Sequence, residues 1–183
     1  ITRKNGYLTF DNFWDLKLSK KIVKKKGKID LVYSANTISH IPNLNEVFKS
    51  ISYCLEKNGV FVFEDPYIGS VIKNNSYDQF YDEHVHLFSF ISISNIVKKN
   101  NLKIIDVEIL KTHGGSIRFY VAKAGSRHKV SSRVKKIFKY EIKNKLNKFS
   151  TYKSFSKRVA KSKKKLVFLL KKLKRNNKKV ISY

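Results

Sequence analysis

The chain has 183 residues, enough for one domain with its own hydrophobic core, and its formal net charge of +27 excludes an acidic or electrically balanced protein. Hydrophobic residues make up 42% of the sequence, which excludes a chain that is disordered by composition. The single cysteine, Cys54, excludes an internal disulfide framework and a cysteine-rich zinc site within the chain, and no apolar run reaches the roughly 18–20 residues that span a bilayer.

Helix and strand signals alternate from the start of the chain. After a short apolar stretch at residues 8–10, apolar residues at helical spacing predict a helix over Asp15–Lys26, which Gly27 ends. The dense apolar run Ile29–Ala35 predicts a strand that is buried on both faces.

The second helix and the second strand follow the same pattern. Pro42 and Asn43 precede a helix that we expect over Leu44–Lys57, and Asn58-Gly59 ends it. The apolar run Val60–Phe63 then predicts another buried strand.

The next elements close the α/β pattern. Ser92 and Ser94 are candidate caps of a helix that reaches Asn101, and two consecutive strands are expected over Leu102–Leu110 and Ile117–Ala122. Alternating strands and helices imply a parallel sheet with helices on both faces, and the two consecutive strands imply one antiparallel member at the end. The predicted fold class is therefore α/β.

The charge divides the chain at residue 126. Residues 1–126 hold 18 basic and 12 acidic residues, whereas residues 127–183 hold 22 basic residues and one acidic residue, Glu141. From Val134 to Leu173 the apolar residues recur at steps of three and four, which predicts helix, with a break at Ser150-Thr151. We expect the last residues, Val180–Tyr183, to begin another strand.

The type of base bears on nucleic-acid binding. The chain has 34 lysines and only 6 arginines, whereas a surface that reads phosphates or bases usually relies on arginine. We therefore interpret the lysine excess as compositional and the segment 127–183 as a packing surface with solvated lysines, which makes a nucleic-acid partner unlikely.

Three groups of residues are candidates for chemistry. The segment Tyr77–Ser89 gathers tyrosines, carboxylates and two histidines behind the second buried strand, near the edge where open α/β sheets bind ligands. His40 follows the other buried strand, and the third group is His113-Gly114-Gly115-Ser116 with Arg118. Each group also has a structural interpretation: a solvated polar loop, a capping histidine and a hairpin turn, respectively.

Two kinds of site are disfavoured. The alternation of His84 and His86 suggests a metal pair, but no cysteine and no further spaced histidine accompany it. None of the seven glycines forms a G-x-G pattern, so the chain has neither a phosphate loop nor the glycine motif of methyltransferases.

Taken together, these motifs resemble the sugar C-methyltransferases, which use S-adenosylmethionine (SAM) to methylate a ketosugar nucleotide at carbon. The matching stretches are NTISHIPN (36–43), EDPY (64–67), YDEHVHLFS (81–89), HGGSIR (113–118) and the terminal residues 180–183. The resemblance implies the second half of a class I SAM methyltransferase sheet, Rossmann-like, with a terminal antiparallel strand, in residues 1–126. The basic helical segment 127–183 would lead into a C-terminal domain.

The resemblance also implies an internal piece of a longer enzyme. Such enzymes have an N-terminal zinc-binding domain, a central SAM-binding domain and a C-terminal domain. This chain would begin inside the central domain, after the glycine motif, and end at the first strand of the C-terminal domain. Zinc is then expected only in an N-terminal domain outside the chain, and SAM is the expected cofactor.

The chemistry of carbon methylation explains which residues such a site needs. A carbon next to a ketone is a weak acid, so a base must remove its proton while the enolate oxygen is stabilised. By resemblance, His84 is the base, Tyr81 and Glu83 orient it or contact the sugar, and His40 lies near the keto oxygen as a donor or second acid/base group.

The remaining site residues are assigned to the two ligands. By resemblance, His113, Ser116 and Arg118 shape the substrate side. Asn36 and Phe13 are expected to contact SAM on the basis of their position in the fold alone. We assign His86 no role.

The sequence thus predicts a SAM-dependent C-methyltransferase that acts on a nucleotide-linked ketosugar, with no membrane partner. A cytoplasmic location is expected because the first residues contain no signal sequence and the one cysteine is unpaired. Two alternatives are a methyltransferase of the same fold with another small acceptor, and a non-catalytic basic module that binds nucleic acid through residues 127–183.

Overall fold

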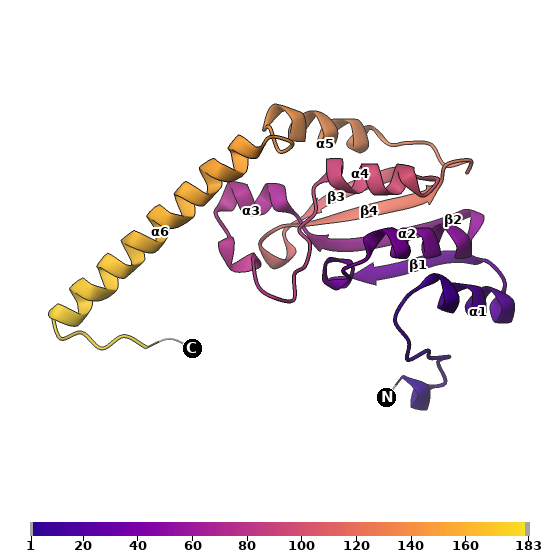
Figure 1. The fold of residues 1–183 in the computed structure, drawn as a ribbon, viewed down its shortest axis with the longest axis horizontal. Helices are drawn as coiled ribbons and strands as arrows, with labels where there is room; N and C mark the ends of the chain where they lie inside the picture. Colours follow the sequence, from indigo (N-terminus) through magenta and orange to yellow (C-terminus); the bar gives the residue numbers. More distant parts are fainter. Residues whose placement is uncertain (1, 182–183) are drawn as a thin grey trace.

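The computed structural model describes residues 2–181, and its centre is a four-stranded sheet with the strand order β1-β2-β4-β3 (Figure 1). The strands are β1 (Ile29–Ala35), β2 (Leu55–Pro66), β3 (Leu102–Leu110) and β4 (Ser116–Lys123). β1 and β2 are parallel, while β4 runs antiparallel to both β2 and β3. The predicted α/β class and the antiparallel last strand are therefore confirmed.

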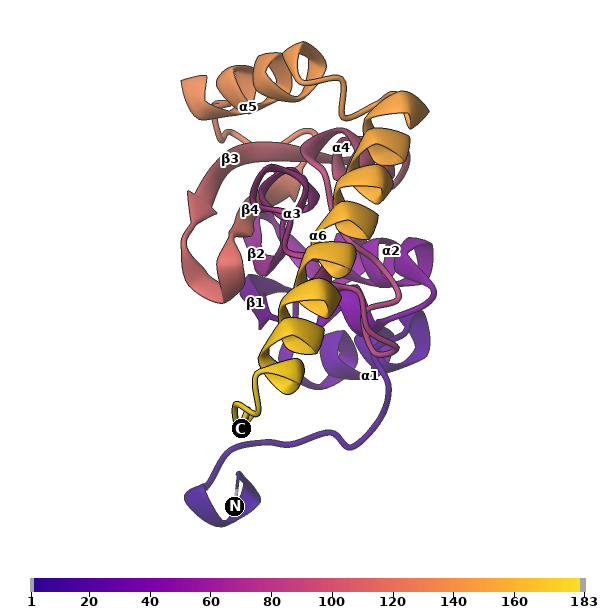
Figure 2. The same cartoon turned by 90° about the vertical axis from the view of Figure 1, so that its left-hand side faces the viewer.

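Helices α1, α2 and α4 lie on one side of this sheet (Figure 2). The helices of the structure are α1 (Leu16–Lys26), α2 (Leu44–Cys54), α3 (Ile68–Asn74), α4 (Phe90–Lys99), α5 (Ser132–Lys143) and α6 (Phe149–Arg175). Single 3-10 turns cover residues 3–5, 38–40, 77–79 and 112–114. Within residues 2–181, no helix is both long and apolar enough to cross a membrane.

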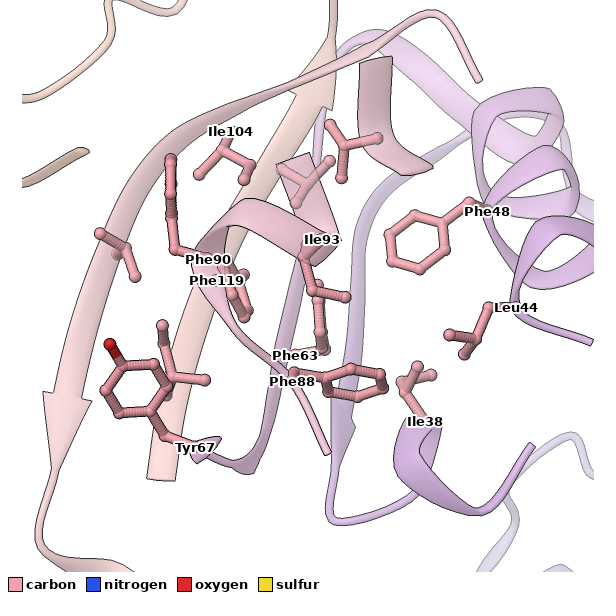
Figure 3. Packing of buried hydrophobic residues seen from close by; sticks show 14 of the residues in the cluster. Ile38, Leu44, Phe48, Phe63, Tyr67, Phe88, Phe90, Ile93, Ile104 and Phe119 are labelled. Atoms are coloured by element: carbon pink, nitrogen blue, oxygen red, sulfur yellow. The ribbon is translucent and has the colours of Figure 1, made fainter. Parts of the chain in front are cut away.

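The hydrophobic core fills the space between the sheet and helices α2 and α4 (Figure 3). Phe63 stacks on Phe119 with ring centroids 4.9 Å apart, and Phe48 of α2 meets Phe63 edge-on at 5.7 Å. These rings are fully buried, as is Ile93 of α4, and burial of each such side chain contributes about 1.5–3 kcal/mol. This packing fixes the strand ends from which the polar loops emerge.

The opposite face of the sheet differs from the prediction. The expectation that helices cover both faces is wrong for residues 2–181, because α1 packs against α2 and α5 packs against β3 and α4. Leu31 and Tyr33 of β1 are consequently 61% and 60% exposed, although their strand was expected to be buried on both faces. The apolar composition of β1 predicted packing on both faces, but among residues 2–181 helices pack against only one face of this strand.

Polar side chains set the helix ends. Asp15 accepts a hydrogen bond from the backbone N–H of Leu18 at the start of α1, and Asn43 accepts one from Glu46 at the start of α2. α4 is capped by Ser89, whose side chain accepts from the N–H of Ser92 in a capping box. The predicted capping role of Ser92 is thus confirmed, since its side chain accepts from the N–H of Ser89, whereas Ser94 lies inside the helix.

Other differences have local causes. The expected extension of α2 to Lys57 is wrong, because Leu55 already pairs with Ile29 of β1. Asn58 and Gly59, which were expected to end the helix, lie within β2. Helix α3 was not anticipated, and residues 8–10 form no strand.

The basic segment forms two helices, as predicted, but the break lies at 144–148 instead of Ser150-Thr151. α5 lies along β3, and α6 extends away from the sheet (Figure 1). Residues 180–181 lie outside any strand, and the rest of the strand predicted at the terminus falls outside the described residues.

Glu141 joins the basic segment to the rest of the fold. Its carboxylate is fully buried and accepts hydrogen bonds from the backbone N–H groups of Phe90 (2.6 Å) and Ile91 (2.9 Å) at the start of α4. Burial raises the pKa of this carboxyl group. The one acidic residue among 127–183 thus binds the positive end of α4.

A second link is an ion pair between α5 and β3. Arg133 bonds to Asp106 and to Glu108, in the second case with an Nη1–Oε1 distance of 2.7 Å. The hydrogen bond from Arg133 lowers the pKa of Asp106 to about 2.

The lowered pKa of Asp106 predicts a pH-dependent contribution to stability. A carboxylate with a depressed pKa stabilises the fold above pH ~4 and loses that contribution as the pH falls towards 2. Because the pair is partly solvated, we expect Asp106→Asn to lower the free energy of unfolding by only about 1 kcal/mol at pH 7, with a smaller difference at pH 3. Urea unfolding of both proteins at the two pH values measures this. A difference that grows on acidification would contradict it.

Candidate active site

Tyr81 and His84 form a hydrogen-bonded pair in the loop between α3 and α4. The hydroxyl of Tyr81 lies 2.8 Å from Nε2 of His84, and Nδ1 of His84 lies 2.9 Å from the carbonyl oxygen of Gln79. A carbonyl only accepts hydrogen bonds, so Nδ1 carries the proton and donates it. Nε2 is therefore the ring nitrogen that can take up a proton, and the hydroxyl of Tyr81 lies beside it.

His40 lies beside this pair. It ends the 3-10 turn that follows β1, and its ring centroid is 5.0 Å from that of His84. Both rings are half-buried. The loop is tied to this turn because the N–H of His86 donates to the carbonyl of Ser39 at 3.0 Å. The structure therefore brings Tyr81, His84 and His40 together, whereas the side chain of Glu83 is exposed in the adjoining turn.

Asp65, which the sequence analysis did not select, lies at the carboxyl end of β2. It is fully buried, and its Oδ1 accepts a hydrogen bond of 3.0 Å from the N–H of Ser39. Burial raises the pKa of its carboxyl group, while hydrogen bonding to Ser39 and, after it, the charges of His40 and His84 act in the opposite direction. The only signal in the sequence was its place in the EDPY stretch at the end of a buried strand.

A second cluster forms at the turn between β3 and β4. His113, Gly114 and Gly115 all have positive φ, at +49°, +76° and +127°. Asn36, which follows β1, also has positive φ, and its Nδ2 lies 3.4 Å from Nε2 of His113. The structure thus places one expected SAM contact against one expected substrate contact, at the carboxyl edge of the sheet.

Ser116 and Arg118 occupy structural positions near this turn. Ser116 is fully buried and donates to the carbonyl of Thr112. Arg118 binds Glu64 with an Nη2–Oε2 distance of 2.8 Å, and this hydrogen bond raises the pKa of its guanidinium group. The hydroxyl of Thr112 also donates to Glu64 at 2.9 Å. Ser116 and Arg118 therefore hold the turn that carries His113, Ser116 through the carbonyl of Thr112 and Arg118 through Glu64.

The carboxylates beneath the two clusters point to opposite faces of the sheet. Glu64 and Asp65 are consecutive in β2, so their side chains point to opposite faces. Asp65 faces the histidine pair, and Glu64 with Arg118 faces the side that Leu31 and Tyr33 share.

Phe13 and His86 stand outside both clusters. Phe13 is 96% exposed in the segment before α1, and within residues 2–181 no hydrogen bond or aromatic contact joins it to another candidate. Nε2 of His86 lies 3.2 Å from the carbonyl of Pro42, so this ring holds a loop in place. In the part of the chain that the structure describes, no group of three or more His, Cys, Asp or Glu side chains is arranged to hold a metal ion.

Two family models match this chain. A family model described as a methyltransferase domain matches residues 5–107, and one described as a C-methyltransferase C-terminal domain matches residues 111–183. Since the first match covers more than half of the sequence, the chain belongs to the methyltransferase-domain family. The second match and the similarity to a curated C-methyltransferase agree with the predicted resemblance to the C-methyltransferases.

That curated relative is C-methyltransferase NovU from Streptomyces niveus, which is 31% identical over 130 residues. The match covers 71% of this chain, and the chain spans about a third (31%) of the relative's length.

Two solved structures are similar at low identity. A SAM-dependent methyltransferase from Clostridium acetobutylicum is 16% identical with a TM-score of 0.44, and the match covers 68% of each chain. Magnesium protoporphyrin IX methyltransferase from Synechocystis, with bound SAH, is 13% identical with a TM-score of 0.41, covering 52% of this chain and 45% of that one.

Proposed function

We propose that this chain provides the proton-abstracting side of an enzyme that transfers a methyl group from SAM to a carbon next to the keto group of a nucleotide-linked deoxysugar. The observation that carries the proposal is the contact pattern of His84, whose Nδ1 donates to a backbone carbonyl and leaves Nε2, beside the hydroxyl of Tyr81, as the nitrogen that can take up a proton. The similarity to a C-methyltransferase supports carbon as the methylated atom.

In this proposal His84 removes the proton. As Nε2 takes the proton from carbon, the hydrogen bond from Nδ1 to Gln79 strengthens and stabilises the imidazolium. The hydroxyl of Tyr81, which rests on Nε2, is released when the substrate takes its place and becomes available to the sugar. Glu83, exposed in the same turn, is placed to bind a sugar hydroxyl.

His40 stabilises the enolate. Its ring centroid lies 5.0 Å from that of His84. A keto group bound against these two rings therefore has the base, His84, at its neighbouring carbon and a hydrogen-bond donor, His40, at its oxygen. The electron pair left on carbon would form the new bond to the methyl group that bound SAM supplies, with S-adenosylhomocysteine as the leaving group, and the proton stays on His84.

The cofactor fits at the other cluster. When bound, SAM supplies an electrophilic methyl group. Asn36 follows β1 in a left-handed conformation, with its amide turned towards His113, so both residues offer polar groups at the sheet edge. Phe13 is proposed as a further contact because its ring is free in the segment before α1. Ser116 and Arg118 act on the substrate side by holding the His113 turn.

The direct test is methyl transfer from SAM labelled with carbon-13 in its methyl group to a panel of nucleotide-linked ketosugars. We expect the labelled methyl on the carbon next to the ketone, seen by NMR as a carbon–carbon coupling. Label on oxygen or nitrogen would overturn the proposal, as would transfer only to acceptors without a ketone. The cytoplasmic location stays a prediction.

A further inference from the structure

Asp65 is a buried carboxylate beside the histidine side of the candidate site, and it has no task in the proposed mechanism. It comes from β2 and lies beneath the 3-10 turn that carries His40. Its two oxygens differ: Oδ1 accepts from the N–H of Ser39 at 3.0 Å, whereas Oδ2 is buried and has no hydrogen-bond partner among residues 2–181. A buried carboxylate oxygen without a donor is costly and calls for an explanation.

The first contact explains how the turn is held. The peptide groups on both sides of Ser39 are fixed, since its N–H donates to Asp65 and its carbonyl accepts from the N–H of His86. His40 is the next residue, so the position of its ring follows from these two hydrogen bonds. The side chain of Ser39 is also fully buried, with its hydroxyl oxygen unpaired.

The second oxygen lies where a negative charge acts on the rings. His40 and His84 are the two histidines whose charge acts on Asp65, and all three side chains are buried or half-buried. The other titratable group at His84 is Tyr81, while Asp82 and Glu83 lie exposed in the adjoining turn. In such surroundings a fixed carboxylate favours the imidazolium form of a nearby histidine.

We propose that Asp65 is a positioning residue that holds the His40 turn through Oδ1 and, through the charge on its unpaired oxygen, stabilises the imidazolium that forms when a proton reaches the histidine pair. This proposal rests on the proposed function for its catalytic meaning. The effect of Asp65 on the charge of His40 and His84 does not depend on any substrate.

The test is NMR of the histidine rings in the 183-residue chain, without substrate. Only five histidines are present, so the ring nitrogen signals of His40 and His84 are readily separated. Asp65→Asn keeps an oxygen acceptor for the N–H of Ser39 and removes the charge. At pH 6.5 we expect the ratio of imidazolium to imidazole at His40 and His84 to fall about tenfold in this variant, corresponding to one pH unit.

Two controls separate charge from structure. Asp106→Asn makes the same chemical change at a carboxylate paired with Arg133 on another part of the sheet, and it should leave both rings unchanged. His128, whose ring bonds to the carbonyl of Asn58, serves as an internal reference in every spectrum. Unchanged ring signals in Asp65→Asn would overturn the proposal, and so would equal changes in both variants.

The outcome is separate from that of the methyl-transfer assay. If the proposed function is wrong, no labelled product forms, but the charge states of His40 and His84 still change as expected in Asp65→Asn. Failure of the inference about Asp65 would appear in the ring signals while product still forms.

Discussion

Replacement of His84 by alanine is expected to lower kcat for methyl transfer about 1,000-fold while SAM still binds. General-base catalysis contributes about 10²–10⁴-fold, and alanine leaves no basic atom where Nε2 stood. SAM binding should persist because the Asn36 and His113 cluster lies at a separate part of the sheet edge. The measurement pairs steady-state kinetics with calorimetric titration of SAM, using protein that carries out the reaction.

Tyr81→Phe is the matched variant for this experiment. It keeps an aromatic ring, whose centroid lies 4.0 Å from that of His84, and removes only the hydroxyl. We expect a loss of about tenfold, because one hydrogen bond of roughly 1.5 kcal/mol is removed while the base remains. Turnover of His84→Ala at or above the level of Tyr81→Phe would show that His84 is not the base.

Replacement of Gly115 by alanine is expected to lower the free energy of unfolding by about 3 kcal/mol. Gly115 has φ +127°, which an L-residue rarely adopts, and an added Cβ would lie 2.3 Å from Cβ of Ser70. Its carbonyl also accepts a hydrogen bond of 3.0 Å from the N–H of Tyr67, so the turn cannot move away without losing that bond. Urea unfolding of this chain and its variant measures the difference.

Gly125→Ala is the control for this change. An added Cβ there meets nothing within 4 Å, so the free energy of unfolding should change by less than about 0.5 kcal/mol. Ser70→Gly in the Gly115→Ala background removes the clash and leaves the backbone strain, so it should restore part of the loss. Equal stabilities of the two alanine variants would contradict the close packing of the HGGS turn.

Local signals in the sequence were sufficient for much of the fold. β1 and β3 have the predicted bounds, and α1 begins one residue after the predicted start because Asp15 is its cap. The errors arise where tertiary contacts override local propensity. α2 ends early because Leu55 pairs with β1, a contact that helical spacing cannot report.

The candidate site shows the same division. The resemblance predicted that Tyr81 orients His84 or contacts the sugar, and the structure shows the two side chains in contact. The sequence alone also places a histidine after each buried strand. The approach of His40 to His84 depends on how two loops 44 residues apart pack at the sheet edge. The burial of Asp65 and the pairing of Arg118 with Glu64 depend on the register of β2 and β4, which no local pattern contains.

The exchange of substrate hydrogen with solvent tests the central claim most directly. In deuterium oxide, with S-adenosylhomocysteine in place of the methyl donor, an enzyme that uses His84 as a carbon base should exchange the hydrogen next to the keto group of its sugar substrate. We predict deuterium at that carbon with the unaltered protein, detected by mass spectrometry, and none above the uncatalysed rate with His84→Ala. Exchange at the same rate in both proteins would contradict the assignment of His84 as the base.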